Sequence, residues 1–302
     1  LIRSLDGHEG FVKGVCFEPR TGDRLASGAS DRTVRLWSSA SGELVDSLTC
    51  SGPVRTVAFS PDGAQVVAAC EDYSVHLWLP VEHSSRSWAS GHGNRLQAAA
   101  FSPQGDLLFT ASSDGVKLWN VLGHEPVEVR QLVGAKSPAA IVPAGDMLAA
   151  AAGEGRIGIW QLGSGEAVKD MPCPSVPLSL AASADGKLLA AGCMDNMIRI
   201  WDLQTGGLLH TLAGHSRNVT AVAFSPDGRI LASAGPGKPN SVVILWNLRA
   251  QNGASQELKR LEGHGDDWIM DVAFSPDGKL LASAGNDKRV CIWGVKRPSG
   301  TQ

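Results

Sequence analysis

The chain has 302 residues, 43% of them hydrophobic and 19% charged, and its 27 lysines and arginines nearly balance its 30 aspartates and glutamates at a net charge of -3. This composition predicts a soluble globular protein with a substantial core, and the balanced charge argues against nucleic acid as the main partner. No apolar run approaches the roughly 18 residues of a membrane-spanning helix, and the start lacks the layout of a signal peptide. We therefore expect no membrane association and a cytoplasmic location.

An internal repeat is visible in the spacing of the tryptophans. Seven of the nine follow one another at intervals of 41, 41, 41, 41, 45 and 47 residues, and each closes an apolar phrase such as TVRLW or MIRIW. A fixed period of about 20 to 50 residues indicates a modular architecture. The seven are Trp37, Trp78, Trp119, Trp160, Trp201, Trp246 and Trp293.

Each repeat unit has the pattern of short antiparallel strands. Apolar positions alternate, as in VTAVAFSPDGRILASAG at 219–235, and turn signals interrupt them at short intervals. FSPDG occurs at 59–63, 224–228 and 274–278, with the variant FSPQG at 101–105. Proline cannot donate to a strand ladder and glycine accepts positive φ, so each copy ends one strand and turns the chain into the next.

The phrases GH, VxxVxFSPDG and LASxxxDxxVxIW recur in register in seven units and resemble the WD-repeat β-propeller family over essentially the whole chain. The resemblance implies an all-β fold of seven four-stranded antiparallel blades around a central channel, formed by residues 1–302 as one unit. The regular units resemble bacterial members, whose propellers are often attached to kinase, NTPase or effector domains. Because the chain begins at Leu1 and ends in the polar KRPSGTQ, we expect a segment of a longer protein.

The first residues predict how the ring closes. A leucine stands three residues before the histidine of each clear GH, as Leu212 does before His215, and marks the outer strand of the preceding blade. Leu5 has this position before His8, where the only preceding blade is the last one. We predict that residues 1–5 pair as the outer strand of blade seven and cover its edge.

Three units contain a histidine, a hydroxyl residue and an aspartate, which is the residue set of a nucleophilic hydrolase. An active site does not usually repeat around a ring, and the chain has no GxSxG turn to expose a nucleophile. The resemblance implies a structural network in which the aspartate orients the imidazole and the hydroxyl bridges it to the indole N–H. The sets are His8, Ser27, Asp31 and Trp37; His92, Thr110, Asp114 and Trp119; and His264, Ser283, Asp287 and Trp293.

The other units depart from this pattern. Blade two has Ser51 and Ala68 at the histidine and hydroxyl positions, and blade five has Pro174 and Ala191. Blade six lacks the aspartate and contains an insertion at 235–241, whereas blade four lacks all three residues and has Glu154 at the aspartate position. We expect blade four to be the least protected against hydrogen exchange because it relies on apolar packing alone.

The resemblance implies that the loops leading into the blades and the turns between second and third strands share one face, which is the usual contact surface of the family. Phe11 and Trp268 on this face, with acidic neighbours, have the composition of an interface hot spot. Arg55 and Arg95 either clamp an acidic group or are solvated charges. The predicted partner-binding residues are Phe11, Lys13, Arg55, Arg95, Asn218, Asp266, Asp267, Trp268, Met270 and Asn286.

Two tryptophans lie outside the repeat, and each has two interpretations. Trp268 either belongs to the contact surface or replaces the core valine found at that point in other blades. Trp88 either lies exposed on an outer strand or is buried by a one-residue shift in register.

The sequence favours no metal and no cofactor. The six cysteines form no CxxC pair, and the chain has no phosphate-binding or dinucleotide-binding loop. We expect the cysteines to be buried small apolar residues in a reducing compartment. The histidines outside the repeat have no partner at ligand spacing; they are His76, His83, His124 and His210.

The leading hypothesis is a non-catalytic scaffold or sensor that binds a protein or peptide of unknown identity. One alternative is an enzyme or small-ligand binder that uses the channel mouth. It requires ionisable groups with perturbed pKa values in the channel, and the inner strands offer few. Another alternative is a structural spacer or oligomerisation unit, and the oligomeric state stays open.

Overall fold

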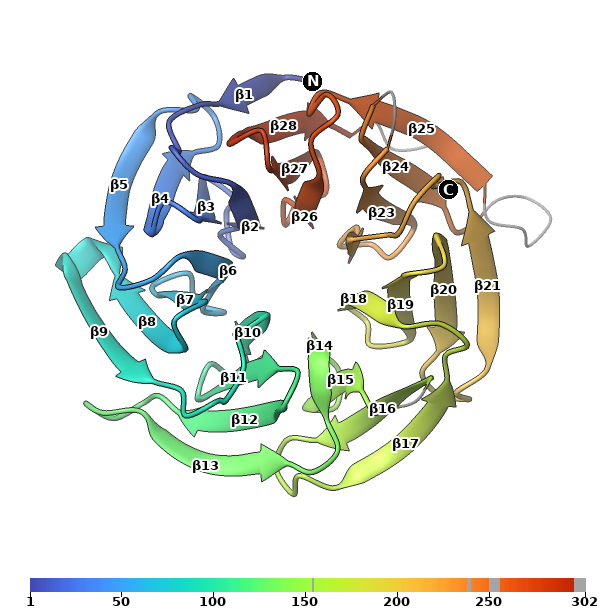
Figure 1. The fold of residues 1–302 in the computed structure, drawn as a ribbon, viewed down its shortest axis with the longest axis horizontal. Coiled ribbons are helices and arrows are strands. Elements are labelled where there is room, and N and C mark those ends of the chain that lie inside the picture. The colour runs from blue at the N-terminus through green and yellow to red at the C-terminus, as the bar shows by residue number, and fades with distance from the viewer. Residues whose placement is uncertain (154, 238–239, 250–255, 296–302) are drawn as a thin grey trace.

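The seven repeats form a ring of seven four-stranded antiparallel sheets in the residues that this computed structural model describes (Figure 1). These are residues 1–302 except 154, 238–239, 250–255 and 296–302. Each sheet is one blade, and the blades surround a central channel (Figure 1). The fold class predicted from the sequence, an all-β seven-bladed propeller, is confirmed. Among the described residues, no helix has the length and apolar character needed to cross a membrane.

In blades one to six the chain runs from an inner strand at the channel to an outer strand at the perimeter, and in blade seven the outer strand is the N-terminal β1 (Figure 1). Blade one comprises β2 (Val12–Phe17), β3 (Arg24–Ala29), β4 (Thr33–Ser38) and β5 (Leu44–Thr49). Blade two comprises β6 (Val54–Phe59), β7 (Val66–Cys70), β8 (Ser74–Leu79), the short 3-10 helix η1 (Pro80–Glu82) and β9 (Ser84–Ala89). Blade three comprises β10 (Ala98–Phe101), β11 (Leu107–Ser112), β12 (Gly115–Asn120) and β13 (Val127–Leu132).

The second half of the ring follows the same order. Blade four comprises β14 (Lys136–Val142), β15 (Met147–Ala151), β16 (Arg156–Gln161) and β17 (Ala167–Pro172). Blade five comprises β18 (Pro177–Ala182), β19 (Leu188–Cys193), β20 (Met197–Asp202) and β21 (Leu208–Ala213). Blade six comprises β22 (Ala221–Phe224), β23 (Ile230–Gly235), β24 (Val242–Asn247) and β25 (Gln256–Glu262). Blade seven comprises β26 (Ile269–Phe274), β27 (Leu280–Gly285), β28 (Val290–Gly294) and β1 (Arg3–Leu5).

The FSPDG sequences end the inner strands, as their composition predicts. In blade two, β6 stops at Phe59, and the Ser60 hydroxyl donates to Asp62 at 2.5 Å while it accepts the N–H of Gln65 at 2.9 Å. Gly63 has a φ of 73°, a conformation that glycine adopts without a steric penalty. The turn therefore directs the chain back into the second strand of the same sheet.

Neighbouring blades are held together by shared apolar cores. The cluster between blades seven and one includes Leu5, Val15, Trp37 and Ile292. Each of the seven repeat tryptophans lies in a third strand and is at most 5% exposed. Burial of large aromatic side chains supplies much of the free energy that holds one blade against the next.

The N-terminal strand closes the ring as predicted. β1 pairs with β28 in antiparallel register, with Leu5 opposite Val290, and Ile2 adds a backbone hydrogen bond to Ile292 at 2.8 Å. Leu5 is buried between blades seven and one. Because the chain passes from β1 directly into blade one, this pairing ties the first blade to the last.

We expect Leu5→Ala to destabilise the protein by about 2–5 kcal/mol, since it removes a buried leucine from a packed core. Deletion of residues 1–5 should lower the melting temperature further, because it also exposes the edge of β28. Leu1→Ala is the matched control, since Leu1 is 64% exposed. Equal stability of wild type and deletion variant in chemical and thermal denaturation would refute this mode of closure.

Candidate interaction surface

The polar residues of blade one form a continuous hydrogen-bonded chain. His8 Nδ1 lies 2.8 Å from Asp31 Oδ2, and His8 Nε2 lies 2.8 Å from Ser27 Oγ. The Trp37 indole donates to the same hydroxyl at 2.8 Å. Asp31 also accepts the backbone N–H of Glu9 at 2.9 Å. The chain of bonds thus ties the loop that leads into the blade to its second and third strands.

Blades three and seven contain the same arrangement. The aspartate and hydroxyl of each blade flank the histidine, and the tryptophan donates to the hydroxyl. The distances are His92–Asp114 2.9 Å, His92–Thr110 3.0 Å, Trp119–Thr110 2.9 Å, His264–Asp287 2.9 Å, His264–Ser283 2.7 Å and Trp293–Ser283 2.9 Å.

The burial of the hydroxyls argues for a structural role of these sets. Ser27, Thr110 and Ser283 are 0% exposed, so a substrate cannot approach the oxygen that a hydrolase would use. Each oxygen already accepts the indole N–H and contacts the imidazole. A buried hydrogen-bonded network of this kind makes the loop conformation rigid.

The blades that depart from the pattern leave polar atoms without partners. The indole Nε1 of Trp201 in blade five and the Nδ1 of His215 in blade six are buried and have no hydrogen-bond partner among the described residues. The hydroxyl is missing beside Trp201, and the aspartate is missing beside His215. In blade four the Trp160 indole donates instead to the carbonyl of Val133 at 3.2 Å, while Glu154 lies outside the described residues.

Exposed aromatic side chains lie at equivalent positions of blades seven and one. Phe11 stands one residue before β2 and is 47% exposed, and Trp268 stands one residue before β26 and is 42% exposed. Their carbonyls accept the N–H groups of Ser30 and Asn286, both at 2.9 Å, which fixes the two loops. The core position belongs to Ile269, which is 0% exposed, so the interpretation of Trp268 as a core residue is wrong.

The other predicted contact residues divide between the rim and the channel. Arg95, Asp266 and Asp267 are exposed at the rim. Asn218 and Asn286 are half-buried there. The channel is lined by the remaining three, which are Lys13, Arg55 and Met270.

The channel contains a cluster of charges. It forms a cavity of about 320 Å³ lined by the inner strands. At its mouth Glu71 accepts a hydrogen bond from Lys13 and lies 3.7 Å from Arg95. Glu71 therefore partly neutralises the basic groups that the sequence suggested as an anion clamp.

Asp271 in β26 is a channel residue that sequence reasoning missed. Burial raises the pKa of its carboxyl to about 6, although the N–H of Val15 donates to it at 3.0 Å and Arg55 is nearby. Burial likewise lowers the pKa of Arg55. The expectation that inner strands contribute few perturbed ionisable groups therefore needs correction. The sequence signal that could have identified Asp271 is that it is the single charged residue in the apolar inner-strand sequence IMDVAF.

The register of blade two explains the position of Trp88. Trp88 pairs with Val75, the position that Leu48 occupies opposite Val34 in blade one. The segment between Trp88 and His92 is one residue longer than the corresponding segment between Leu5 and His8. The indole is half-buried and packs edge-on against Trp119 at 5.8 Å between ring centroids. The one-residue register shift is the interpretation that the structure supports.

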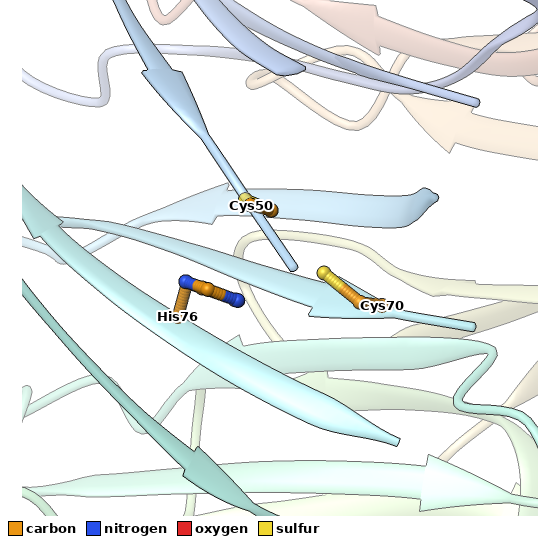
Figure 2. A group of neighbouring side chains, drawn as sticks. All are labelled: Cys50, Cys70 and His76. Atoms are coloured by element: carbon orange, nitrogen blue, oxygen red, sulfur yellow. The ribbon is translucent and has the colours of Figure 1, made fainter. Parts of the chain in front are cut away.

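One side-chain cluster contradicts the sequence-based interpretation of the histidines. His76 was expected to lie without a partner at ligand spacing, but its ring is buried beside Cys50 and Cys70 (Figure 2). The residues come from a loop and two strands of blade two. Sequence spacing could not reveal the cluster because 20 or more residues separate Cys50 from the other two.

Comparison with known families identifies the repeat. The model of the family described as "WD domain, G-beta repeat" matches six segments: 1–38, 42–78, 84–120, 167–202, 206–247 and 255–294. The chain belongs to the WD40 family. The matched segments omit residues 121–166, which contain most of blade four, the blade that lacks the polar set.

Several characterised proteins are similar to this WD40 chain. Serine-threonine kinase receptor-associated protein of Gallus gallus is 25% identical over 81% of this chain and 69% of its own length. Protein HIR1 of Cryptococcus neoformans is 36% identical over 34% of this chain and 13% of its own length. WD repeat-containing protein AAC3 of Dictyostelium discoideum is 25% identical over 58% of this chain and 39% of its own length. The chain thus covers less than two thirds of the length of protein HIR1 and of AAC3.

The polar network makes a testable contribution to acid stability. Partial burial opposes ionisation of Asp114, but hydrogen bonds from Ser112, the N–H of Gly93 and His92 prevail and lower its pKa to about 2. An unfolded aspartate has a pKa of about 3.9. The carboxylate therefore stabilises the fold above about pH 4, and this contribution is lost as the pH falls toward 2.

We expect Asp114→Asn to reduce the slope of unfolding free energy against pH between about pH 4 and pH 2. The reduction corresponds to at most one proton taken up on unfolding, and chemical denaturation across that pH range measures it. Asp6→Asn is the control, because Asp6 is exposed and outside the network. An unchanged slope in Asp114→Asn would show that the network does not hold this carboxylate ionised.

Proposed function

We propose that this propeller is an interaction scaffold that binds a protein or peptide at the rim between blades seven and one. The observation that carries the proposal is the pair Phe11 and Trp268, exposed at equivalent positions of adjacent blades, where the next residue of the chain begins the inner strand and is fully buried. Large rigid aromatics on a fixed backbone lose little conformational entropy on binding and are typical anchors of interfaces.

The charges around this pair define the chemistry of the proposed partner. Asp266 and Asp267 are exposed beside Trp268, whereas Lys13 and Arg95 at the channel mouth are paired with Glu71. A segment with an apolar anchor flanked by lysine or arginine complements this surface. The family supports the proposal in general terms, and the name of one relative describes association with a receptor kinase.

The test compares capture of native extract proteins by wild type and by a Phe11→Ala/Trp268→Ala variant. Truncation of an interface anchor weakens binding by roughly 30-fold or more. We therefore expect the variant to lose a partner that wild type retains. The partner's affinity is then measured by calorimetry with both proteins, and Asp266→Asn/Asp267→Asn should reduce the dependence of binding on salt.

Val81→Ala/Leu122→Ala is the matched control. These side chains are 79% and 74% exposed and lie in connections between third and fourth strands, which the antiparallel order places on the opposite face. Equal binding by wild type and the aromatic variant, with loss in the control variant, would place the interface on that other face and contradict the proposal.

A second candidate function is recognition of a small charged ligand or a chain end in the channel. The observation that favours it is the raised pKa of Asp271, about 6, beside Arg55 in a cavity of about 320 Å³. In this case Asp271→Asn alters binding and its pH dependence between about pH 5 and 7, while Phe11→Ala/Trp268→Ala has no effect. The two sites are thus distinguished by which variant changes affinity.

A further inference from the structure

Blade two contains two thiols and one imidazole that converge on one point. Cys50 follows β5 in the loop that leads into the blade, Cys70 ends β7, and His76 lies in β8. Their ligand atoms all lie within 4.8 Å of one another. In Figure 2 the imidazole and the Cys70 sulfur point toward each other, with Cys50 beside them. The residues are 4%, 0% and 8% exposed, respectively.

The surroundings of the three groups suit a metal ligand set. The imidazole of His76 is buried, and its ligand nitrogen lies within 4.8 Å of both sulfur atoms. His76 Nε2 accepts the N–H of Ser51 at 3.3 Å and lies 3.1 Å from the Ser51 hydroxyl, and a metal ion bound at this nitrogen would replace both contacts. Cys50 and Cys70 are both free thiols, so neither sulfur is held in a disulfide and both are available to a metal ion.

We propose that Cys50, Cys70 and His76 bind one zinc ion, with a water molecule as the fourth ligand. Thiolate sulfur and imidazole nitrogen are the donors that zinc prefers, and three protein ligands with one open position form a known type of zinc site. Two thiolates neutralise the charge of the ion, so the complex carries no net charge into a buried environment.

The observed spacing requires only a small adjustment. Tetrahedral zinc with bonds of about 2.3 Å to sulfur and 2.0 Å to nitrogen separates its ligand atoms by about 3.5–3.8 Å. The atoms here are at most 4.8 Å apart. Because Cys50 is in a loop, movement of its side chain can bring the sulfur closer without disturbing the β7–β8 pairing.

The position of the cluster gives the ion a structural task. In blades one, three and seven, the histidine–aspartate network ties the incoming loop to the second and third strands. Blade two has Ser51 and Ala68 at two network positions, and His76 lies directly opposite Ala68 in the β7–β8 pair. Zinc bound by Cys50, Cys70 and His76 would join the same three segments.

Blade five provides an internal comparison. Cys173 and Cys193 occupy the same positions as Cys50 and Cys70, and their sulfur atoms are 4.0 Å apart. The position of His76 is taken by Arg199, which lies opposite Ala191 and binds Asp195 at 2.6 Å. A guanidinium supplies no lone pair and repels a cation, so the proposal assigns no site to blade five.

The test is a titration of the reduced, metal-free protein with Co²⁺ as a spectroscopic probe and then with Zn²⁺. We expect one Co²⁺ per chain with thiolate-to-cobalt charge-transfer absorption, displacement of Co²⁺ by Zn²⁺, release of protons, and a higher melting temperature with Zn²⁺. Cys50→Ala/Cys70→Ala should abolish the absorption and the thermal shift. Cys173→Ala/Cys193→Ala should retain both.

Two further variants keep the test decisive if the double cysteine variant folds poorly. His76→Gln should weaken Zn²⁺ binding at least tenfold with both thiols intact, as expected for loss of one of three protein ligands. Arg199→His should raise the stoichiometry from one Co²⁺ to two. The proposal is overturned if the reduced wild type shows no saturable charge-transfer absorption, or if the absorption survives in Cys50→Ala/Cys70→Ala.

Discussion

The pairing of β1 with β28 is the interaction on which the rest of the ring depends. A blade buries its faces against two neighbours, so seven blades reach a packed state only when the first and the last meet. The chain meets this constraint by giving blade seven its outer strand from the N-terminus. Leu5 then contributes to the same apolar cluster as Trp37 and Ile292. The pairing that closes the ring therefore also completes the apolar core between blades seven and one.

The closed ring holds its loops in place with polar bonds that differ from blade to blade. Where the histidine, hydroxyl and aspartate are complete, the incoming loop is fixed to two strands, and the residues at its end project from a rigid base. Phe11 belongs to such a loop, and so does Trp268, between His264 and β26. In blade two, Cys50 of the incoming loop and His76 of the third strand lie where blades one, three and seven have this polar network. The variation lies in how each loop is anchored, while the apolar packing stays constant.

The sequence predicted the fold because its signals are local and repeated. The tryptophan recurs in seven units and the FSPDG or FSPQG turn in four, so the copies reinforce one another. The leucine before each clear GH likewise marks the outer strand of the preceding blade, which places Leu5 in blade seven. It did not predict Asp271 in the channel, because the environment of that carboxyl depends on Val15 and Arg55 from two other blades. The Cys50–Cys70–His76 cluster escaped for a similar reason, since a loop and two strands bring its members together. For Trp88 a single additional residue changed the register, and only the strand pairing decides between the two interpretations.

The most direct test of the closed ring is native-state hydrogen exchange measured by mass spectrometry on peptides that cover β1 and β28. If β1 completes blade seven, the bonded amides of both strands exchange only when the ring opens globally, and they do so at the same rate. Fast exchange in the β1 peptide with retained protection in β28 would contradict closure by the N-terminal strand.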